Sequence, residues 1–114
     1  MYRQARIILV EDDYYSRSFM EMLLRRDFRT SIIGDAGNPI KLHDILTEKI
    51  DNNDIIDLLL IDTEVPDNRE WLRYVLKQIE SLIPIPRIIF TCNVPNNDTY
   101  TLLRVKNCAG YIKK

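Results

Sequence analysis

Three short apolar runs constrain the fold of this chain more than any other feature of its sequence. They occupy residues Arg6–Val10, Asp57–Ile61 and Arg87–Thr91. Polar and apolar residues do not alternate in these runs, so each would form a strand that is buried on both faces. Such strands are typical of parallel sheets covered by helices. Two weaker strands are predicted at Thr30–Ile33 and Gly110–Lys113.

Segments with helical periodicity separate these strands. In each, apolar residues recur three or four positions apart, which is the pattern of a helix that lays one face on a sheet. We predict helices over Ser16–Asp27, Ile40–Ile50, Asn68–Ile83 and, more weakly, Pro95–Asn107. Gly34 is interpreted as a break after the second strand. The alternation predicts an α/β fold, a flavodoxin-like doubly wound sheet of five parallel strands in the order 2-1-3-4-5.

The composition fits one globular domain spanning residues 1–114. Apolar residues make up 46% of the chain, charged residues 29%, and the formal net charge is −1. We therefore expect no direct nucleic-acid binding by this domain, because no strongly basic stretch is present. No apolar run is long enough to span a membrane. Cys92 and Cys108 lack metal-ligand spacing and are expected to be reduced thiols in a cytoplasmic protein.

Polar residues follow the predicted strands at the edge where a doubly wound sheet binds its ligands. The first strand ends in Glu11-Asp12-Asp13, the third in Asp62, the fourth in Thr91 and the fifth in Lys113-Lys114. Carboxylates this close repel one another, and a divalent cation such as Mg²⁺ would relieve the repulsion. The Thr and Lys could hold a phosphoryl group. A simpler alternative, capping of a helix N-terminus, is plausible for one of the three adjacent acids.

Four stretches in chain order extend this interpretation. The segments ILVEDD, LLLIDTEVP, IIFT and AGYIKK together resemble the signatures of response regulator receiver domains (CheY-like) of two-component signalling. The resemblance covers nearly the whole chain. It implies a phosphoacceptor domain that takes a phosphoryl group from a sensor histidine kinase or a phosphotransfer protein, and that is not an enzyme beyond self-phosphotransfer and autodephosphorylation.

The resemblance implies a Mg²⁺ site around the phosphoacceptor, Asp62. Asp12 and Asp13 match the acidic pair that binds the ion in the family. Glu64 matches the position whose backbone carbonyl is a further ligand. Glu11 is then expected to be a bystander on the rim of the site.

The resemblance also implies how a phosphoryl group is held and sensed. Thr91 and Lys114 match the hydroxyl and ammonium residues that contact it. Tyr111 matches the switch aromatic, which changes rotamer as the hydroxyl moves. The surface formed by the fourth helix and fifth strand would then change for a partner to detect.

The chain stops at Lys114, where the family continues into a fifth helix. The first and fifth strands are therefore expected to lack cover on one face. An apolar patch of that kind tends to find a partner, either an output domain or a second copy.

Two other functions remain open. A pseudo-receiver would keep the fold as a protein-interaction module without phosphotransfer. A phosphatase of the haloacid dehalogenase type is faintly suggested by Asp62-Thr63-Glu64, although Pro66 follows too soon for the usual loop of that family.

Overall fold

Five parallel strands form one sheet in the order β2-β1-β3-β4-β5. The computed structural model describes residues 3–63, 76–82, 84–93, 104 and 107–113. The strands are β1 (Ala5–Val10), β2 (Thr30–Ala36), β3 (Leu58–Asp62), β4 (Arg87–Cys92) and β5 (Cys108–Lys113), and the helices with complete bounds are α1 (Tyr14–Arg25) and α2 (Pro39–Asp51). The predicted sheet order and parallel pairing are confirmed.

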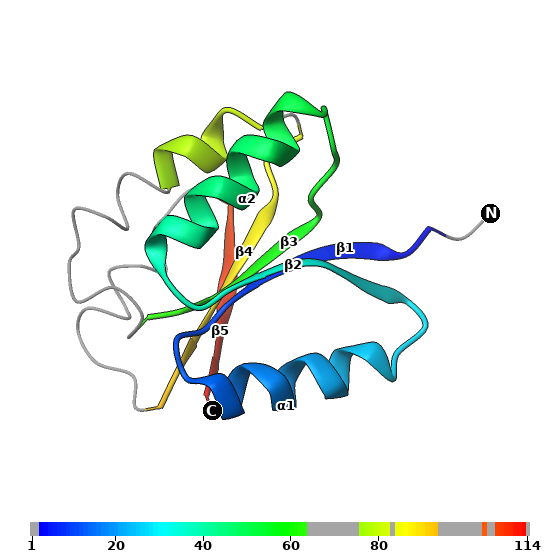
Figure 1. The fold of residues 1–114 in the computed structure, drawn as a ribbon, viewed down its shortest axis with the longest axis vertical. Coiled ribbons are helices and arrows are strands. Elements are labelled where there is room, and N and C mark those ends of the chain that lie inside the picture. The colour runs from blue at the N-terminus through cyan, green and yellow to red at the C-terminus, as the bar shows by residue number, and fades with distance from the viewer. Residues whose placement is uncertain (1–2, 64–75, 83, 94–103, 105–106, 114) are drawn as a thin grey trace.

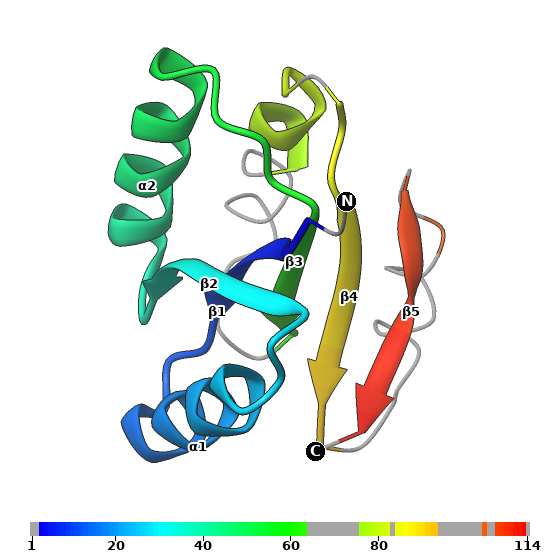
Figure 2. The ribbon, with the colours of Figure 1, turned by 90° about the vertical axis from the view of Figure 1, so that its right-hand side faces the viewer.

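Helices cover both faces of the sheet, as the unalternating strands predict. Figure 1 shows α1 on one side and α2 on the other, with the helical residues 76–80 on the same side as α2. Figure 2 shows β4 and β5 running alongside each other at one end of the sheet. None of the described helices is long and apolar enough to cross a membrane.

The core is split by the sheet into two clusters, because successive side chains of a strand point to opposite faces. On β1, Ile8 and Val10 belong to the larger cluster with Leu42 and Leu46 of α2. The other face holds a smaller cluster of Ile7, Leu9 and Leu60, against which Met20 and Leu24 of α1 pack. Each of the four β1 residues is at most 2% exposed.

The second strand is longer than the sequence predicts. It runs through Gly34 to Ala36, and Gly34 pairs with Ile8 after a register shift in the ladder. A Cβ at Gly34 would lie 3.1 Å from Cγ2 of Ile45, closer than ordinary contact. The interpretation of Gly34 as a break was therefore wrong: the glycine lies inside the strand, where its small size lets α2 approach.

The predicted helix bounds can be compared with the structure for α1, α2 and part of the third helix. α1 begins two residues before the predicted segment, and α2 matches its predicted segment to within one residue at each end. Residues 76–80 of the helix predicted over Asn68–Ile83 are helical, and its earlier part lies outside the described residues. The helix predicted over Pro95–Asn107 also falls almost wholly outside them.

The expectation that β1 lacks cover on one face was wrong. β1 is buried on both faces because Met20 and Leu24 of α1 pack over Ile7 and Leu9. The expectation fits β5 better, since Ile112 is 52% exposed. The two cysteines are both free thiols.

Asp57, which directly precedes β3, forms hydrogen bonds to β1 and β4 at the edge of the sheet opposite the predicted site. Asp57 Oδ2 accepts a 2.7 Å hydrogen bond from the Arg6 amide, and Arg3 donates to both Asp57 oxygens at 2.8 and 2.7 Å. The Asp57 carbonyl accepts from the Arg87 amide at 3.0 Å, which connects β4. The hydrogen bond from Arg3, and then that from the Arg6 amide, lower the pKa of Asp57.

The substitution Asp57→Asn is expected to lower the free energy of unfolding by about 1–2 kcal/mol at pH 7. The estimate stays at this level because Arg3 is 59% exposed, so water screens the ion pair. Since the pKa of Asp57 is lower in the folded chain, its contribution is full above the unfolded value of about 3.9 and is lost as the pH falls through the folded value. Urea unfolding of both proteins from pH 7 to pH 3 measures this. A difference that grows on acidification would contradict it, and Asp44→Asn, at an exposed position, is the control.

Candidate functional site

Asp62 is the last residue of β3, and its side chain is buried at the carboxyl end of the sheet. It is 1% exposed and pairs in register with Thr91 of β4, which is 3% exposed. The Thr63 amide donates a 2.9 Å hydrogen bond to the Thr91 carbonyl, so the two strands stay paired beyond Asp62. A buried carboxylate and a buried hydroxyl residue therefore occupy neighbouring strand ends, as the sequence predicts.

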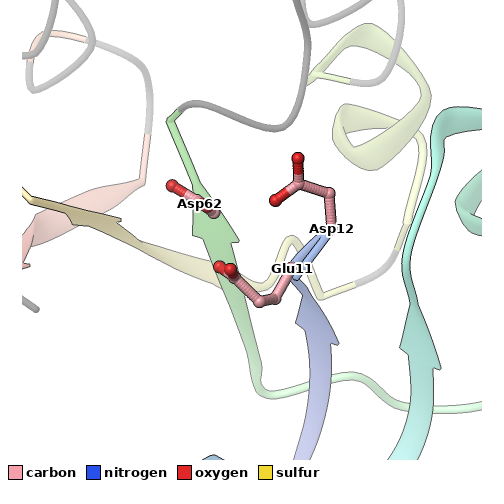
Figure 3. A group of neighbouring side chains, drawn as sticks. All are labelled: Glu11, Asp12 and Asp62. Atoms are coloured by element: carbon pink, nitrogen blue, oxygen red, sulfur yellow. The ribbon is translucent and has the colours of Figure 1, made fainter. Parts of the chain in front are cut away.

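Two more carboxylates approach Asp62 from the end of β1. One carboxylate oxygen each of Glu11, Asp12 and Asp62 lies within 4.8 Å of the other two. Glu11 is 1% exposed, whereas Asp12 is exposed to solvent. Figure 3 shows the three side chains gathered at the same end of β1 and β3. The structure thus brings together Asp12 and Asp62, as predicted, with Glu11 as the third member.

Glu11, expected on the rim of the site, is buried instead. The Glu11 amide donates a 3.0 Å hydrogen bond to the Ala36 carbonyl, which continues the β1–β2 ladder by one residue and keeps Glu11 buried. Its carboxylate lies beside that of Asp62 at the end of β3 (Figure 3). Its burial against Asp62 needs compensation by a positive charge or by hydrogen bonds.

Asp13, predicted from the resemblance to bind Mg²⁺, lies at the start of α1. It is the N-cap of α1, and its Oδ2 accepts hydrogen bonds from the Ser16 amide at 2.9 Å and the Ser16 hydroxyl at 2.7 Å. It does not belong to the carboxylate group formed by the described residues. Helix capping, the alternative that the sequence leaves open for one of the three acids, therefore applies to Asp13.

Arg17 of α1 contacts the segment between β1 and α1 that contains Glu11, Asp12 and Asp13. Its Nη1 donates a 2.7 Å hydrogen bond to the Glu11 carbonyl, and its Nε lies 3.9 Å from Oδ2 of Asp35 on β2. A Cβ at Gly37 would lie 2.5 Å from the same Nη1, so the glycine leaves room for the guanidinium. The connection between β1 and α1 is thereby fixed from the side of β2.

The other predicted site residues are only partly described. Tyr111 is on β5, pairs with Phe90 of β4 and is 39% exposed. Ile112, the next residue, pairs with Thr91, so Tyr111 lies one position away from the hydroxyl residue on the adjacent strand. Glu64 and Lys114 fall outside the described residues.

The sequence contains a signal that would have identified Glu11. The apolar run ends at Val10, and a residue that directly follows a central strand can remain in the ladder and be buried. Asp13 stands three residues before Ser16, at the start of the helical periodicity, where aspartate is a favoured N-cap. Assigning the cap to the acid nearest the helical segment would have selected Asp13 and left Glu11 and Asp12 for the site.

The arrangement suits one kind of chemistry. Three carboxylate oxygens are hard ligands of the kind that Mg²⁺ and similar divalent cations prefer, and the cluster is close enough for one ion to contact them. Asp62 also presents a carboxylate, which is a competent nucleophile toward phosphorus.

Comparison with known proteins identifies the fold. No protein-family profile matches the chain. A curated relative, a protein-glutamate methylesterase/protein-glutamine glutaminase from Gluconobacter oxydans, is 30% identical over 87 residues, or 76% of this chain. The match spans only 23% of that protein's length.

Solved structures superpose on nearly the whole chain. The response regulator domain of Thermotoga maritima CheB gives a TM-score of 0.72 at 20% identity, over 98% of this chain and 79% of that one. A CheY-like receiver domain protein from Methanospirillum hungatei gives 0.72 at 20% identity, over 98% and 82%. A chain from the complex of the CheA3 P1 domain with CheY6 of R. sphaeroides gives 0.71 at 20% identity, over 98% and 84%. The chain therefore has the fold of response regulator receiver domains, and the predicted resemblance is confirmed at that level.

Proposed function

We propose that residues 1–114 form the receiver domain of a two-component response regulator, in which Asp62 accepts a phosphoryl group. The observation that carries this proposal is the convergence of Glu11 and Asp12 on a buried Asp62 at the carboxyl end of the sheet. The receiver fold adds support, because ligands of open α/β sheets bind at this edge.

A divalent cation, Mg²⁺ in the cell, fits the cluster. Glu11 and Asp62 are both buried, and two like charges close together in a protein interior destabilise each other unless a cation lies between them. Asp12, which is exposed, leaves one side open to the water molecules that Mg²⁺ usually retains. Glu11, Asp12 and Asp62 would hold the ion, with the backbone carbonyl of Glu64 as a further ligand. When bound, the ion neutralises charge on the phosphoryl oxygens.

The phosphoryl group would pass directly to Asp62. A carboxylate oxygen of Asp62 attacks phosphorus, an O–P bond forms, and the P–N bond to the donor histidine breaks. The departing imidazole takes the bonding electron pair and is then protonated. The Thr91 hydroxyl and the Lys114 ammonium would hold phosphoryl oxygens, and Thr91 is buried beside Asp62 as this role requires.

Phosphorylation would be sensed through β5. Tyr111 lies on the strand next to Thr91 and is 39% exposed, and its ring would change rotamer when Thr91 shifts. The shift would change the surface of β5 and of the segment before it, where a partner detects it.

The donor would be a histidine kinase or phosphotransfer protein in the cytoplasm. One of the superposed structures holds CheY6 in complex with the P1 domain of CheA3, and an equivalent partner is proposed for this chain. An output domain is a second proposed partner. The activity named for the Gluconobacter relative belongs to a protein more than four times the length of the matched part, and we attribute no catalytic turnover to residues 1–114.

Incubation with acetyl phosphate and Mg²⁺ tests the proposal. Intact-protein mass spectrometry should show the gain of one phosphoryl group, and chelation of Mg²⁺ should prevent it. The competing pseudo-receiver predicts no gain under any condition. Repeated turnover of a generic phosphoester would instead point to the haloacid dehalogenase type of phosphatase.

A further inference from the structure

An exposed aromatic ring stands at the turn between α1 and β2, on the edge of the sheet away from the carboxylate site. Phe28 is 77% exposed, and nearby Leu23 of α1 is 47% exposed. Arg25 and Arg26 are exposed beside them. We call this surface, formed by Leu23, Arg25, Arg26, Phe28 and Arg29, the arginine turn.

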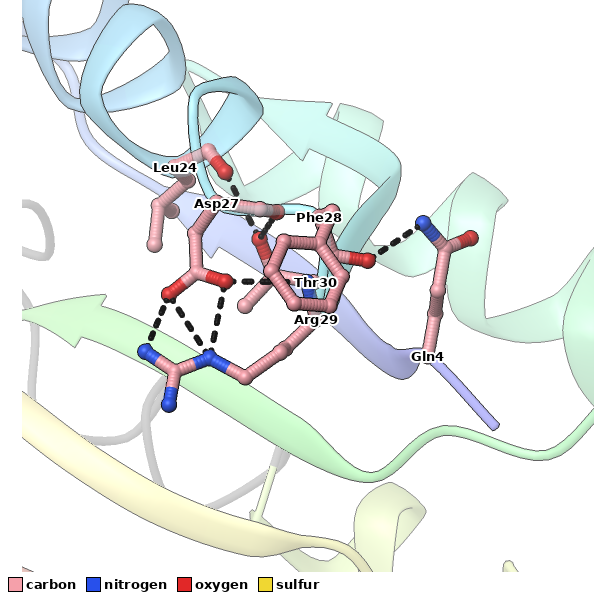
Figure 4. Close-up of polar contacts among 6 residues, drawn as sticks. All are labelled: Gln4, Leu24, Asp27, Phe28, Arg29 and Thr30. Carbon is pink, nitrogen blue, oxygen red and sulfur yellow. Dashed lines mark hydrogen bonds and ion pairs between the residues drawn. The ribbon is translucent and has the colours of Figure 1, made fainter. Parts of the chain in front are cut away.

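The backbone of the arginine turn is held firmly. Asp27 Oδ1 accepts from the amide and Nε of Arg29 at 2.9 Å each, and its Oδ2 accepts from Nη2 at 2.8 Å. The hydrogen bonds from Arg29 lower the pKa of Asp27 to about 2. Gln4 Nε2 donates to the Phe28 carbonyl at 2.9 Å, and Thr30 Oγ1 to the Leu24 carbonyl at 2.7 Å. Figure 4 shows these contacts surrounding Phe28.

A ring displayed on a fixed turn is well suited to binding. Ordering of a loop upon association costs free energy, and a turn that is already ordered avoids that cost. Aromatic and arginine side chains are the types that contribute most to protein interfaces. A shallow hollow of about 400 Å³ lies here, lined by Leu23, Arg26, Asp27, Phe28 and Arg29.

The arginine turn has excess positive charge. Arg29 is compensated by Asp27 at 2.8 Å. Arg26 forms no ion pair with any carboxylate among the residues that the structure describes. A partner of this turn should therefore combine carboxylates with an apolar contact for Phe28.

This chain carries such a surface on the opposite side of its own sheet. Asp44, Glu48 and Asp51 are exposed and spaced four and three residues apart, so they form one stripe along α2. Like charges at this spacing oppose helix formation, and the stripe is therefore a local cost to the fold. Ile40, at the head of the stripe, is 76% exposed.

A second hollow lies on this stripe, and its apolar lining could contact the ring of Phe28. Its volume is about 490 Å³, and Ile40 and Ile45 supply its apolar lining. Asp44 and Glu48 add carboxylates, and Asn38 and Lys41 complete it. We call the surface of Ile40, Asp44, Ile45, Glu48 and Asp51 the acidic face of α2.

We propose that the arginine turn of one copy of this chain docks on the acidic face of α2 of a second copy. The two surfaces lie on opposite sides of the sheet, as Figure 1 shows for α1 and α2, so one molecule cannot join them within itself. The contact joins two unlike surfaces and is therefore heterologous, and the pair retains one unused surface of each kind for further addition. The inference does not depend on phosphorylation of Asp62.

Two variants with complementary defects test the inference. The turn variant carries Arg26→Glu and Phe28→Ala, and the helix variant carries Asp44→Asn and Glu48→Gln. All four positions are exposed, and circular dichroism and thermal unfolding should show that both variants remain folded. Sedimentation velocity at low salt should show a wild-type average mass that rises with concentration, and each variant alone should bind about tenfold more weakly or remain monomeric.

The decisive measurement is an equimolar mixture of the two variants. The helix variant supplies an intact turn and the turn variant an intact acidic face, so the mixture should form a one-to-one dimer and nothing larger. Raising the salt concentration should weaken it, because the contact involves exposed charges. Arg87→Glu, which changes an exposed arginine on β4 by the same charge as Arg26→Glu, should associate as the wild type does.

Three results would overturn the inference. The first is a wild-type protein that stays monomeric at every concentration and salt tested. The second is association that persists in both variants, which would assign it to another surface. The third is a mixture that remains monomeric, which would show that the arginine turn serves a different acidic partner.

Discussion

Asp62→Asn should abolish the gain of a phosphoryl group from acetyl phosphate at saturating Mg²⁺. Asparagine keeps the shape of the side chain at the end of β3, but its amide is a poor nucleophile and the carboxylate that would attack phosphorus is gone. Asp62 is 1% exposed and pairs with Thr91 of β4. No other described carboxylate occupies this position beside Thr91. Intact-protein mass spectrometry over a time course measures the result.

Asp13→Asn is the matched control for this experiment. Asp13 is in the same acidic segment, and asparagine is as good an N-cap as aspartate, so α1 should stay intact. This variant should accept the phosphoryl group as the wild type does. Retention of phosphorylation in Asp62→Asn, with the label mapped to another residue, would refute the proposed acceptor.

Glu11→Gln should raise the Kd for Mg²⁺ by about tenfold to a hundredfold. Unit charges 4 Å apart at an effective dielectric constant of 20 attract by about 4 kcal/mol, and exposure of the site at Asp12 reduces the net effect below that limit. Glutamine preserves the size of the buried side chain, so packing against the strand ends changes little. Isothermal titration calorimetry with Mg²⁺ measures the affinity.

Thermal unfolding gives an independent measurement of the same variant. Mg²⁺ that binds only the folded chain stabilises it by mass action, so the shift in Tm on adding a fixed concentration should be smaller in Glu11→Gln than in the wild type. Asp13→Asn should behave as the wild type in both measurements. The opposite pattern, with Asp13→Asn defective and Glu11→Gln normal, would restore the pair of ligands first predicted from the sequence.

Much of the fold follows from the sequence because the relevant forces are local or periodic. Apolar runs without alternation must be buried on both faces, and amphipathic segments between them must cover the sheet. That reasoning predicts the order of the five strands and places Asp62 and Thr91 at adjacent strand ends. It misplaces Gly34, since a glycine in a sequence looks like a break until the packing of Ile45 against it is known.

In the site, too, some features follow from the sequence and others depend on the tertiary structure. The sequence determines that three acids follow β1 and that one follows β3, and hence that a cation and a phosphoryl group suit this edge of the sheet. Only the tertiary structure shows which of the three acids lie beside Asp62 and which one caps α1. The hydrogen bond from the Glu11 amide to the Ala36 carbonyl extends the β1–β2 ladder through Glu11, which is buried beside Asp62. Because α1 begins at Tyr14, Asp13 is its N-cap. Adjacent residues of like charge are equivalent in sequence, and it is the hydrogen bonds to other parts of the chain that give each a different environment.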